Sequence, residues 1–95
     1  MVIAELSVVP IGEGTSVSRH IRVAISVLKK KGIKYEVGGM STVMEAEDLD
    51  TLFSAIKEAH EAVLELGAKR VITTIKIDDR RDKLQTIESK KRAVE

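Results

Sequence analysis

A loop rich in glycine and hydroxyl side chains is the part of this sequence best suited to binding chemistry. It runs from Pro10 to Ser18, between a strand-like and a helix-like segment. A chain that leaves a strand through proline and glycine and then enters a helix exposes several backbone N–H groups at one point. Such a point can hold an anion or a polar heterocycle. The loop lacks the lysine of a P-loop and the spacing GxGxxG, so a simple turn is the alternative interpretation.

Residues suited to acid–base, nucleophilic or metal chemistry are few and scattered. Glu5 and Glu45 are candidate general bases, but a single carboxylate on a strand more often forms an ion pair. The only histidines, His20 and His60, have no ligand partners at metal-binding spacing, and cysteine is absent, which disfavours a zinc site. No nucleophile forms a pattern with a base. We therefore expect a protein without enzymatic activity, metal or cofactor, with both histidines at the surface or at an interface.

The composition favours one cytoplasmic domain spanning residues 1–95. Charged residues make up 33% of the chain, yet the formal net charge is only +1, whereas nucleic-acid binders usually carry a basic excess. Aromatic residues make up only 2%, which also disfavours base stacking. The apolar runs are too short for a membrane span, and no signal-peptide pattern is present. A small core so poor in aromatic residues favours self-association.

Hydrophobic periodicity predicts a strand, a helix, two strands, a helix, a strand and a final helix. The predicted ranges are strand 2–9, helix 16–31, strand 33–37, strand 40–47, helix 49–66, strand 70–78 and a weakly helical tail over 81–91. The expected helix caps are Thr15 or Ser16, Gly32, Asp48 and Gly67. This order is typical of an α+β fold, the ferredoxin-like βαββαβ sandwich. It predicts an antiparallel sheet of four strands with two helices on one face, here followed by a C-terminal helix.

The two faces of the predicted sheet differ in character. Val2, Ala4, Leu6 and Val8 are expected to face the helices, whose own apolar stripe includes Phe53. The other face is expected to carry Ile3, Glu5, Ser7, Val9, Val43, Glu45, Ile72, Thr74, Lys76 and Asp78. This mixed face is either solvated or meets a second subunit, where its polar groups need partners or a ligand. In the tail, only Leu84 and Ile87 are available as apolar anchors.

Five short segments occur in a fixed order along the chain. The segments read ELSVVPIG from Glu5, TSVS from Thr15, MSTVME from Met40, RV from Arg70 and KIDDR from Lys76. No single segment is specific, but their order along nearly the whole chain is, and it resembles the small thiamine-binding proteins of the YkoF type. The resemblance implies a ferredoxin-like domain that forms dimers and tetramers. It also implies binding of thiamine, or of its hydroxymethylpyrimidine half, without catalysis.

The resemblance also marks candidate ligand-binding positions. They are Ser7, Pro10, Gly12, Ser16, Ser18, Thr42, Glu45 and Lys76. A carboxylate such as Glu45 could offset the thiazolium charge or accept from the pyrimidine amino group, and hydroxyls suit ring nitrogens. The family usually has glycine where this chain has Ser41, and often has one at the position of Ala46. Both departures add side-chain bulk beside the predicted pocket.

A regulatory protein that binds an anion or a phosphate ester is the alternative function. It would use the N-terminus of the first helix together with Lys76 or Arg80. Preference for thiamine phosphate over thiamine would favour this alternative. An enzyme with Glu45 as general base is the third interpretation, and it is the weakest because no acid or nucleophile accompanies that carboxylate.

Overall fold

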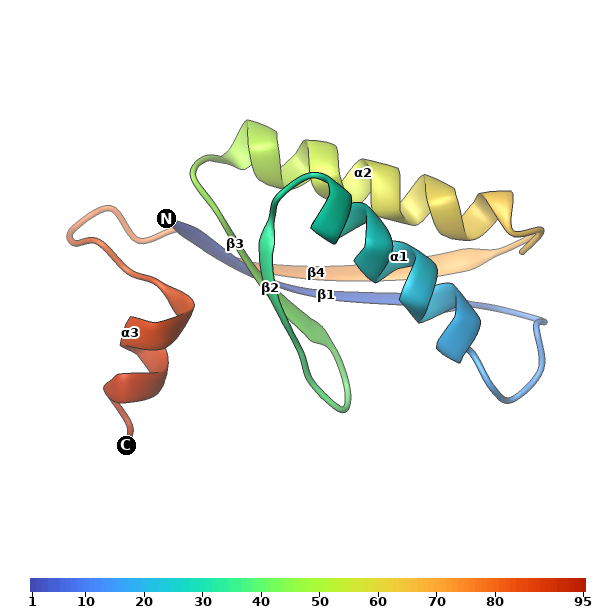
Figure 1. Ribbon diagram of the computed structural model, residues 1–95, viewed down its shortest axis with the longest axis horizontal. Helices are drawn as coiled ribbons and strands as arrows, with labels where there is room; N and C mark the ends of the chain where they lie inside the picture. The colour runs from blue at the N-terminus through green and yellow to red at the C-terminus, as the bar shows by residue number, and fades with distance from the viewer.

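The computed structural model describes residues 1–95 as a layer of two long helices on a four-stranded sheet (Figure 1). The elements are β1 (Val2–Pro10), α1 (Ser18–Lys30), β2 (Lys34–Val37), β3 (Thr42–Ala46), α2 (Leu49–Glu65), β4 (Val71–Asp78) and α3 (Ile87–Arg92). The strands are antiparallel and lie in the order β2-β3-β1-β4. α1 and α2 pack against each other on one face. The predicted ferredoxin-like fold is confirmed.

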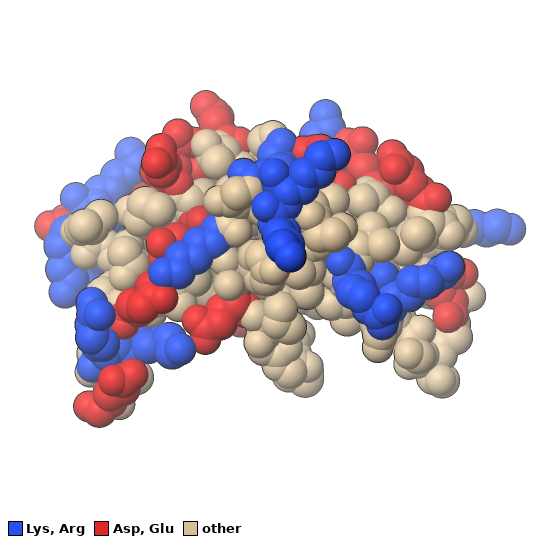
Figure 2. Space-filling model, in the orientation of Figure 1, with Lys and Arg blue, Asp and Glu red and all other residues tan.

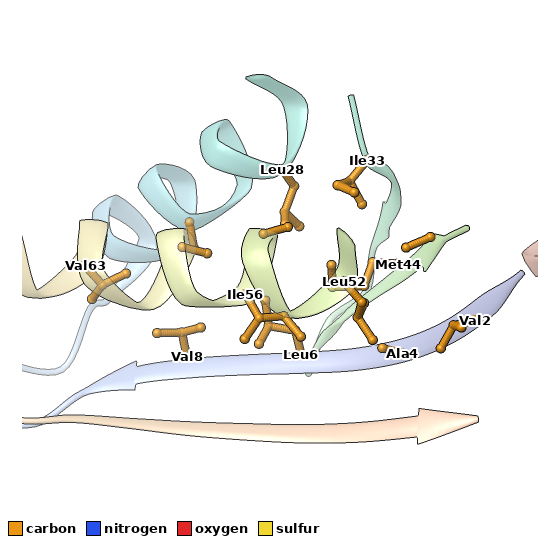
Figure 3. Close-up of a cluster of buried hydrophobic side chains, with 14 residues drawn as sticks. Val2, Ala4, Leu6, Val8, Leu28, Ile33, Met44, Leu52, Ile56 and Val63 are labelled. Carbon is orange, nitrogen blue, oxygen red and sulfur yellow. The ribbon is translucent and has the colours of Figure 1, made fainter. Parts of the chain in front are cut away.

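The hydrophobic core fills the space between the sheet and the two long helices (Figure 3). The alternate β1 residues predicted to face the helices are all buried, namely Val2, Ala4, Leu6 and Val8. They share one face because successive side chains of a strand point to opposite sides. The largest fully buried side chains are Leu28, Met44, Leu52 and Val63. This packed layer fixes α1 over β1 and so determines the space beside it.

The ends of the long helices follow local chemistry. α2 begins where predicted, because the Asp48 carboxylate accepts a hydrogen bond from the backbone N–H of Thr51 at 2.7 Å. Gly32 and Gly67, just beyond the two helices, have φ angles of 71° and 108°, which favour glycine. None of the helices combines the length and the apolar composition needed to cross a membrane.

α1 begins later than the sequence predicts. Its N-cap position is held by Val17, which forms no side-chain cap, and the predicted caps Thr15 and Ser16 remain in the preceding loop. Two glycines of that loop adopt φ angles of 85° and 86°. These left-handed turns take the chain further from β1 before the helix starts. The N-terminus of α1 is therefore not capped by a side chain.

The β2–β3 hairpin has a longer turn than predicted, and both strands are shorter. Gly38–Ser41 form the turn, in which the Gly38 N–H donates to the Ser41 carbonyl oxygen at 2.9 Å. Met40, predicted to lie in a strand, is 93% exposed within it. The two adjacent glycines allow the chain to reverse before pairing resumes at Thr42. The turn consequently extends beyond the sheet (Figure 1).

The sheet face opposite the long helices is partly covered by the C-terminal segment. Ile87 at the start of α3 is buried, and α3 contacts β3. Ile3 is also buried although it points away from α1 and α2. Leu84, the second predicted anchor, is 76% exposed. That prediction is wrong because Leu84 precedes the helix, whose N-cap is Thr86.

Two predictions about single side chains of the long helices are wrong. Phe53, assigned to the apolar stripe of the second helix, is 47% exposed. It lies seven residues before His60, on the side of α2 that contacts Thr73 of β4, and β4 is an edge strand. His20, expected at the surface or an interface, is only 3% exposed. It shares the buried stripe of α1 with Ala24 and Leu28, at spacings of four that the sequence already contained.

Candidate functional site

A groove opens between α1, the middle of β1 and the β2–β3 turn. Its volume is about 130 Å³, and nine of its fourteen lining residues are hydrophobic. None of them is charged; they come from Leu6–Val9, from one face of α1 and from Val37–Thr42. Figure 2 shows the lower end of the hairpin as an uncharged projection below a surface rich in Lys, Arg, Asp and Glu. The groove is thus a small, neutral and mostly apolar site.

Thr42 supplies a polar side chain to this groove. It pairs with Leu6 on one side and with Val37 on the other, which places its side chain on the helix side of the sheet. The residue is 7% exposed, and its hydroxyl remains accessible from the groove. A hydroxyl can donate one hydrogen bond and accept others. Thr42 can therefore bind a ring nitrogen or an amino group at the edge of an apolar cleft.

Ser7 also lines the groove, but with its backbone and not with its hydroxyl. It pairs with Thr74 of β4 and lies directly between Leu6 and Val8, whose side chains face the helices. Its side chain therefore points to the opposite face. What Ser7 offers the groove is the backbone of β1. Ser41, where the resemblance leads us to expect glycine, adds its bulk to the wall formed by the turn.

Glu45 lies outside the groove although it is on the same strand as Thr42. It pairs with Ile3 and Lys34, whose side chains point away from the long helices. Its Oε1 accepts a hydrogen bond from the backbone N–H of Ile87 at 2.8 Å, and the residue is buried. This bond satisfies a donor in the first turn of α3. The geometry therefore gives Glu45 an anchoring role for the C-terminal helix.

Lys76 lies on that same face, on the far side of β1. It pairs with Glu5 across β1 and β4, and both residues are exposed. The sheet thus separates Lys76 from the groove. The sequence grouped Thr42, Glu45 and Lys76 in one site, but the structure does not bring these three side chains together.

The loop residues marked by the resemblance form a third location. Pro10 ends β1 opposite Val71, and Gly12, Ser16 and Ser18 follow it toward α1. None of the four lines the groove. The groove therefore receives two of the eight marked positions, Ser7 and Thr42, and of these only Thr42 by its side chain.

His20 connects this loop to the core. Its Nε2 lies 3.3 Å from Oε1 of Glu13, while its Nδ1 is buried without a hydrogen-bond partner. The contact holds the glycine-rich loop against the first turn of α1. No group of three or more His, Asp or Glu side chains is arranged to hold a metal ion.

The anion-binding alternative depends on cations near the N-terminus of α1. Lys76 lies on the other face of the sheet, as described above. Arg80 is already engaged by Asp82, which accepts from its Nε at 2.5 Å and from its Nη2 at 2.8 Å. Arg80 also follows the end of β4 that pairs with Ile3, whereas α1 is reached from the opposite end of β1, so neither cation lies beside that helix end.

The perturbed pKa values belong to surface ion pairs, most of them in the C-terminal part of the chain, and to Asp48, whose pKa is lowered by the hydrogen bond from the Thr51 N–H. Lys34 donates to Glu88 at 2.6 Å and lowers the pKa of that carboxyl, and Lys90 does the same to the pKa of Asp78 at 2.6 Å. These pairs tie α3 to the sheet. Each is half exposed and therefore contributes little alone. The groove itself contains no ionisable side chain.

Comparison with known proteins identifies the family. The model of the thiamine-binding protein family matches residues 4–95. A UPF0045 protein of Methanothermobacter thermautotrophicus is 55% identical over 83 residues, which cover 86% of this chain and 84% of the relative. Another UPF0045 protein, from Methanocaldococcus jannaschii, is 47% identical over 93 residues, which cover 98% of this chain and 91% of the relative.

Solved structures agree with the family model. The crystal structure of a hypothetical protein from Methanocaldococcus jannaschii superposes with a TM-score of 0.91 at 47% identity, covering 98% of this chain and 94% of that one. A Thermotoga maritima protein, described as a candidate thiamine biosynthesis/salvage protein, gives a TM-score of 0.83 at 30% identity, with coverage of 99% and 98%. Sequence and fold agree along nearly the full length: the chain belongs to the thiamine-binding protein family.

Proposed function

We propose that the protein binds thiamine, or the hydroxymethylpyrimidine half of thiamine, in the groove beside α1 and releases it unchanged. The observation that supports this most is the uncharged groove with the Thr42 hydroxyl at its edge, in a chain of the thiamine-binding family. A mostly apolar cleft with a few fixed polar groups is the usual form of a small-molecule site.

The size of the groove favours the pyrimidine ring as the buried part. Its volume of about 130 Å³ is below the roughly 300–1,000 Å³ of pockets that enclose drug-sized ligands. One flat ring between Ile21, Ile25 and Val37 uses this space well, because aliphatic walls can replace the aromatic residues that the chain lacks. Thr42 then pairs with a ring nitrogen or with the amino group.

The lack of charge in the groove also favours the pyrimidine ring as the buried part of the ligand. The thiazolium ring of thiamine carries a permanent positive charge, and burial of a charge without a partner is costly. No carboxylate lines the groove, and Glu45 faces the other way. In our proposal the thiazolium half remains in solvent, and the pyrimidine half supplies most of the affinity.

The proposal extends to the behaviour of the whole protein. We propose a non-catalytic, cytoplasmic binding protein, since the groove offers no acid, base or nucleophile next to the ligand. We also propose that the chain self-associates into dimers and tetramers. The exposed Val9, Ile72 and Phe53 side chains support this, because they leave apolar area that a second copy can bury.

Titration calorimetry tests the binding proposal. The ligands are thiamine, hydroxymethylpyrimidine, the hydroxyethylthiazole half and thiamine phosphate. We expect the pyrimidine to bind within about tenfold of thiamine, a difference of about 1.4 kcal/mol, and the thiazole half not to bind. Absence of heat and of any thermal shift with both thiamine and the pyrimidine at millimolar concentration contradicts the proposal. Clear preference for thiamine phosphate supports the phosphate-ester alternative.

A further inference from the structure

The rim of the groove carries apolar side chains that the fold leaves uncovered. Ile21 is 39% exposed, Val37 is 56% exposed and Met40 is 93% exposed, and all three line the groove. Large apolar side chains gathered at the mouth of a pocket are typical of a surface that a ligand covers. Ile21 is held by α1 and Val37 by its pairing with β3, whereas Met40 lies in the turn between the two strands. Met40 is therefore the rim residue whose side chain is free to move over a bound ligand.

The side chain of methionine is well suited to cover a ring. It is unbranched, rotates about three bonds, and carries a polarizable sulfur that makes favourable contacts with aromatic rings. The aromatic residues of the chain are Tyr35 and Phe53, and neither of them lines the groove. The thioether of Met40 can therefore supply, on the solvent side of a bound ring, the contact that an aromatic side chain supplies in other sites.

The turn around Met40 leaves its side chain room to move. The backbone bond from the Gly38 N–H to the Ser41 carbonyl oxygen closes the turn, so the backbone of Met40 is fixed while its side chain projects outward. The position of the missing Cβ of the neighbouring Gly39 has no heavy atom within 4 Å. Without ligand, the sulfur of Met40 is thus in contact with solvent and with any small reagent dissolved in it.

The other methionines of the chain are placed differently. The sequence contains three methionines and no cysteine, so thioethers are its only sulfur groups. Met44 lies four residues after Met40 but is 0% exposed within the core. Met1 precedes β1 and does not line the groove. Of the three sulfur atoms, that of Met40 alone is both open to a dissolved oxidant and at the ligand site.

We propose that Met40 is an oxidation-sensitive residue of the ligand site: its thioether covers the bound pyrimidine ring, and conversion to the sulfoxide by a peroxide weakens binding. The inference rests on the proposed binding function and adds a modification site and a means of regulation to it. In the reaction, the sulfur lone pair attacks one oxygen of hydrogen peroxide, and the O–O bond breaks as the S–O bond forms. The departing hydroxide takes the proton of the transferred oxygen and becomes water. The sulfur loses the two electrons that the peroxide gains.

The sulfoxide is unsuited to the position that the thioether can take. Oxidation converts a flexible apolar side chain into a polar, chiral one. Nine of the fourteen residues that line the groove are hydrophobic, so a sulfoxide oxygen folded over the ring would lose its hydration without gaining a donor. The oxidised side chain therefore remains in water, and the ring loses its cover. Because methionine sulfoxide reductases restore the thioether, the change is reversible.

Calorimetry with hydroxymethylpyrimidine before and after treatment with hydrogen peroxide tests the inference, while mass spectrometry locates the added oxygen. We expect Met40 to be oxidised well before Met44, the affinity to fall about 3- to 10-fold, and methionine sulfoxide reductases to restore it. Met40→Leu keeps an apolar side chain of similar volume, so it should bind within about twofold of the wild type and be insensitive to peroxide. Met40→Gln should bind weakly without any oxidant. Met44→Leu is the matched control and should stay sensitive, with circular dichroism to show that it is folded.

Protection by the ligand gives a second measurement of the same contact. Saturating hydroxymethylpyrimidine should slow the oxidation of Met40 several-fold, whereas the thiazole half should leave its rate unchanged. Full oxidation of Met40 with unchanged affinity, or equal oxidation rates with and without the pyrimidine, overturns the inference and leaves the binding proposal standing. Oxidation of Met44 as fast as that of Met40 overturns the assigned site. Absence of pyrimidine binding to the unoxidised protein overturns the proposed function, and the regulation with it.

Discussion

Thr42 and Glu45 lie on the same strand but point to opposite faces of the sheet, because they are three positions apart and successive side chains alternate. Thr42 faces the groove beside α1. Glu45 accepts a hydrogen bond from the Ile87 N–H behind the sheet. A hydroxyl and a carboxylate that look like one polar site in sequence thus have different environments. This separation allows ligand binding and anchoring of the C-terminal helix to be changed one at a time.

The variant Thr42→Val should weaken binding of hydroxymethylpyrimidine about 3- to 10-fold, which corresponds to loss of about one neutral hydrogen bond. Valine has nearly the same shape, so the groove should keep its form and the melting temperature should change little. Calorimetry measures the affinity. Thr74→Val on the exposed face is the matched control and should bind as the wild type does. Equal affinity of Thr42→Val and wild type would exclude Thr42 from the site.

The turn that forms the outer wall of the groove can be tested with two neighbouring glycines. A Cβ at Gly38 would lie 3.0 Å from the carbonyl oxygen of Ser41, whereas a Cβ at Gly39 would meet nothing within 4 Å. Gly38→Ala should therefore distort the turn and reduce ligand affinity, with a loss of about 1 kcal/mol or more in stability. Gly39→Ala should be neutral in both respects. Thermal unfolding and calorimetry compare the pair, and identical behaviour of the two variants contradicts the assigned wall.

Removal of the Glu45 carboxylate should release α3 without affecting the groove. Glu45→Ala leaves the buried Ile87 N–H without an acceptor, which should cost about 1–3 kcal/mol. Glu45→Gln keeps a carbonyl oxygen and should cost less. Hydrogen exchange of residues 86–92 measures the docking of α3. If Glu45→Ala abolished pyrimidine binding while α3 stayed protected, Glu45 would be a ligand residue after all.

The docking of α3 should depend on pH. Hydrogen bonds from Lys90 and Lys34 lower the pKa values of Asp78 and Glu88 in the folded protein. A carboxyl group whose pKa is lowered by folding stabilises the fold at pH values above its ordinary pKa of about 4. This stabilisation is lost as the pH falls through the lowered pKa. The amide resonance of Ile87, followed by NMR from pH 7 to 3, should shift before that of Ile56 in the core. Parallel changes of both amides would show that α3 does not detach independently.

The sequence was sufficient for the elements whose signals are local. The alternation of Val2, Ala4, Leu6 and Val8 and the cap at Asp48 predict β1 and the start of α2, and both are confirmed. These features depend on neighbouring residues within one strand or one helical turn. The order of such elements then leaves few topologies, which is why the sheet arrangement could be predicted.

The site could not be assembled in the same way, because it depends on pairing between distant strands. Alternation already placed Thr42 and Glu45 on opposite faces, but the groove beside Thr42 is closed by the turn Gly38–Ser41, and the predicted strand began too early, at Met40. The cover over Glu45 comes from Ile87, more than forty residues later in the chain. No periodic pattern reports where a tail returns to the sheet. The spacing of His20 from Ala24 and Leu28, in contrast, was a local signal of burial.

The strand order β2-β3-β1-β4 has a consequence for the shape of the ligand-binding curve. The groove adjoins the β2–β3 turn at one margin of the sheet, and the β4 edge is the opposite margin. The residues that line the groove all come from a single chain, and none of them belongs to β4. Each copy would then fill independently, with a hyperbolic isotherm and no cooperativity. Substitutions in the groove that alter the choice of ligand would leave the β4 edge unchanged, so the two features are free to evolve separately.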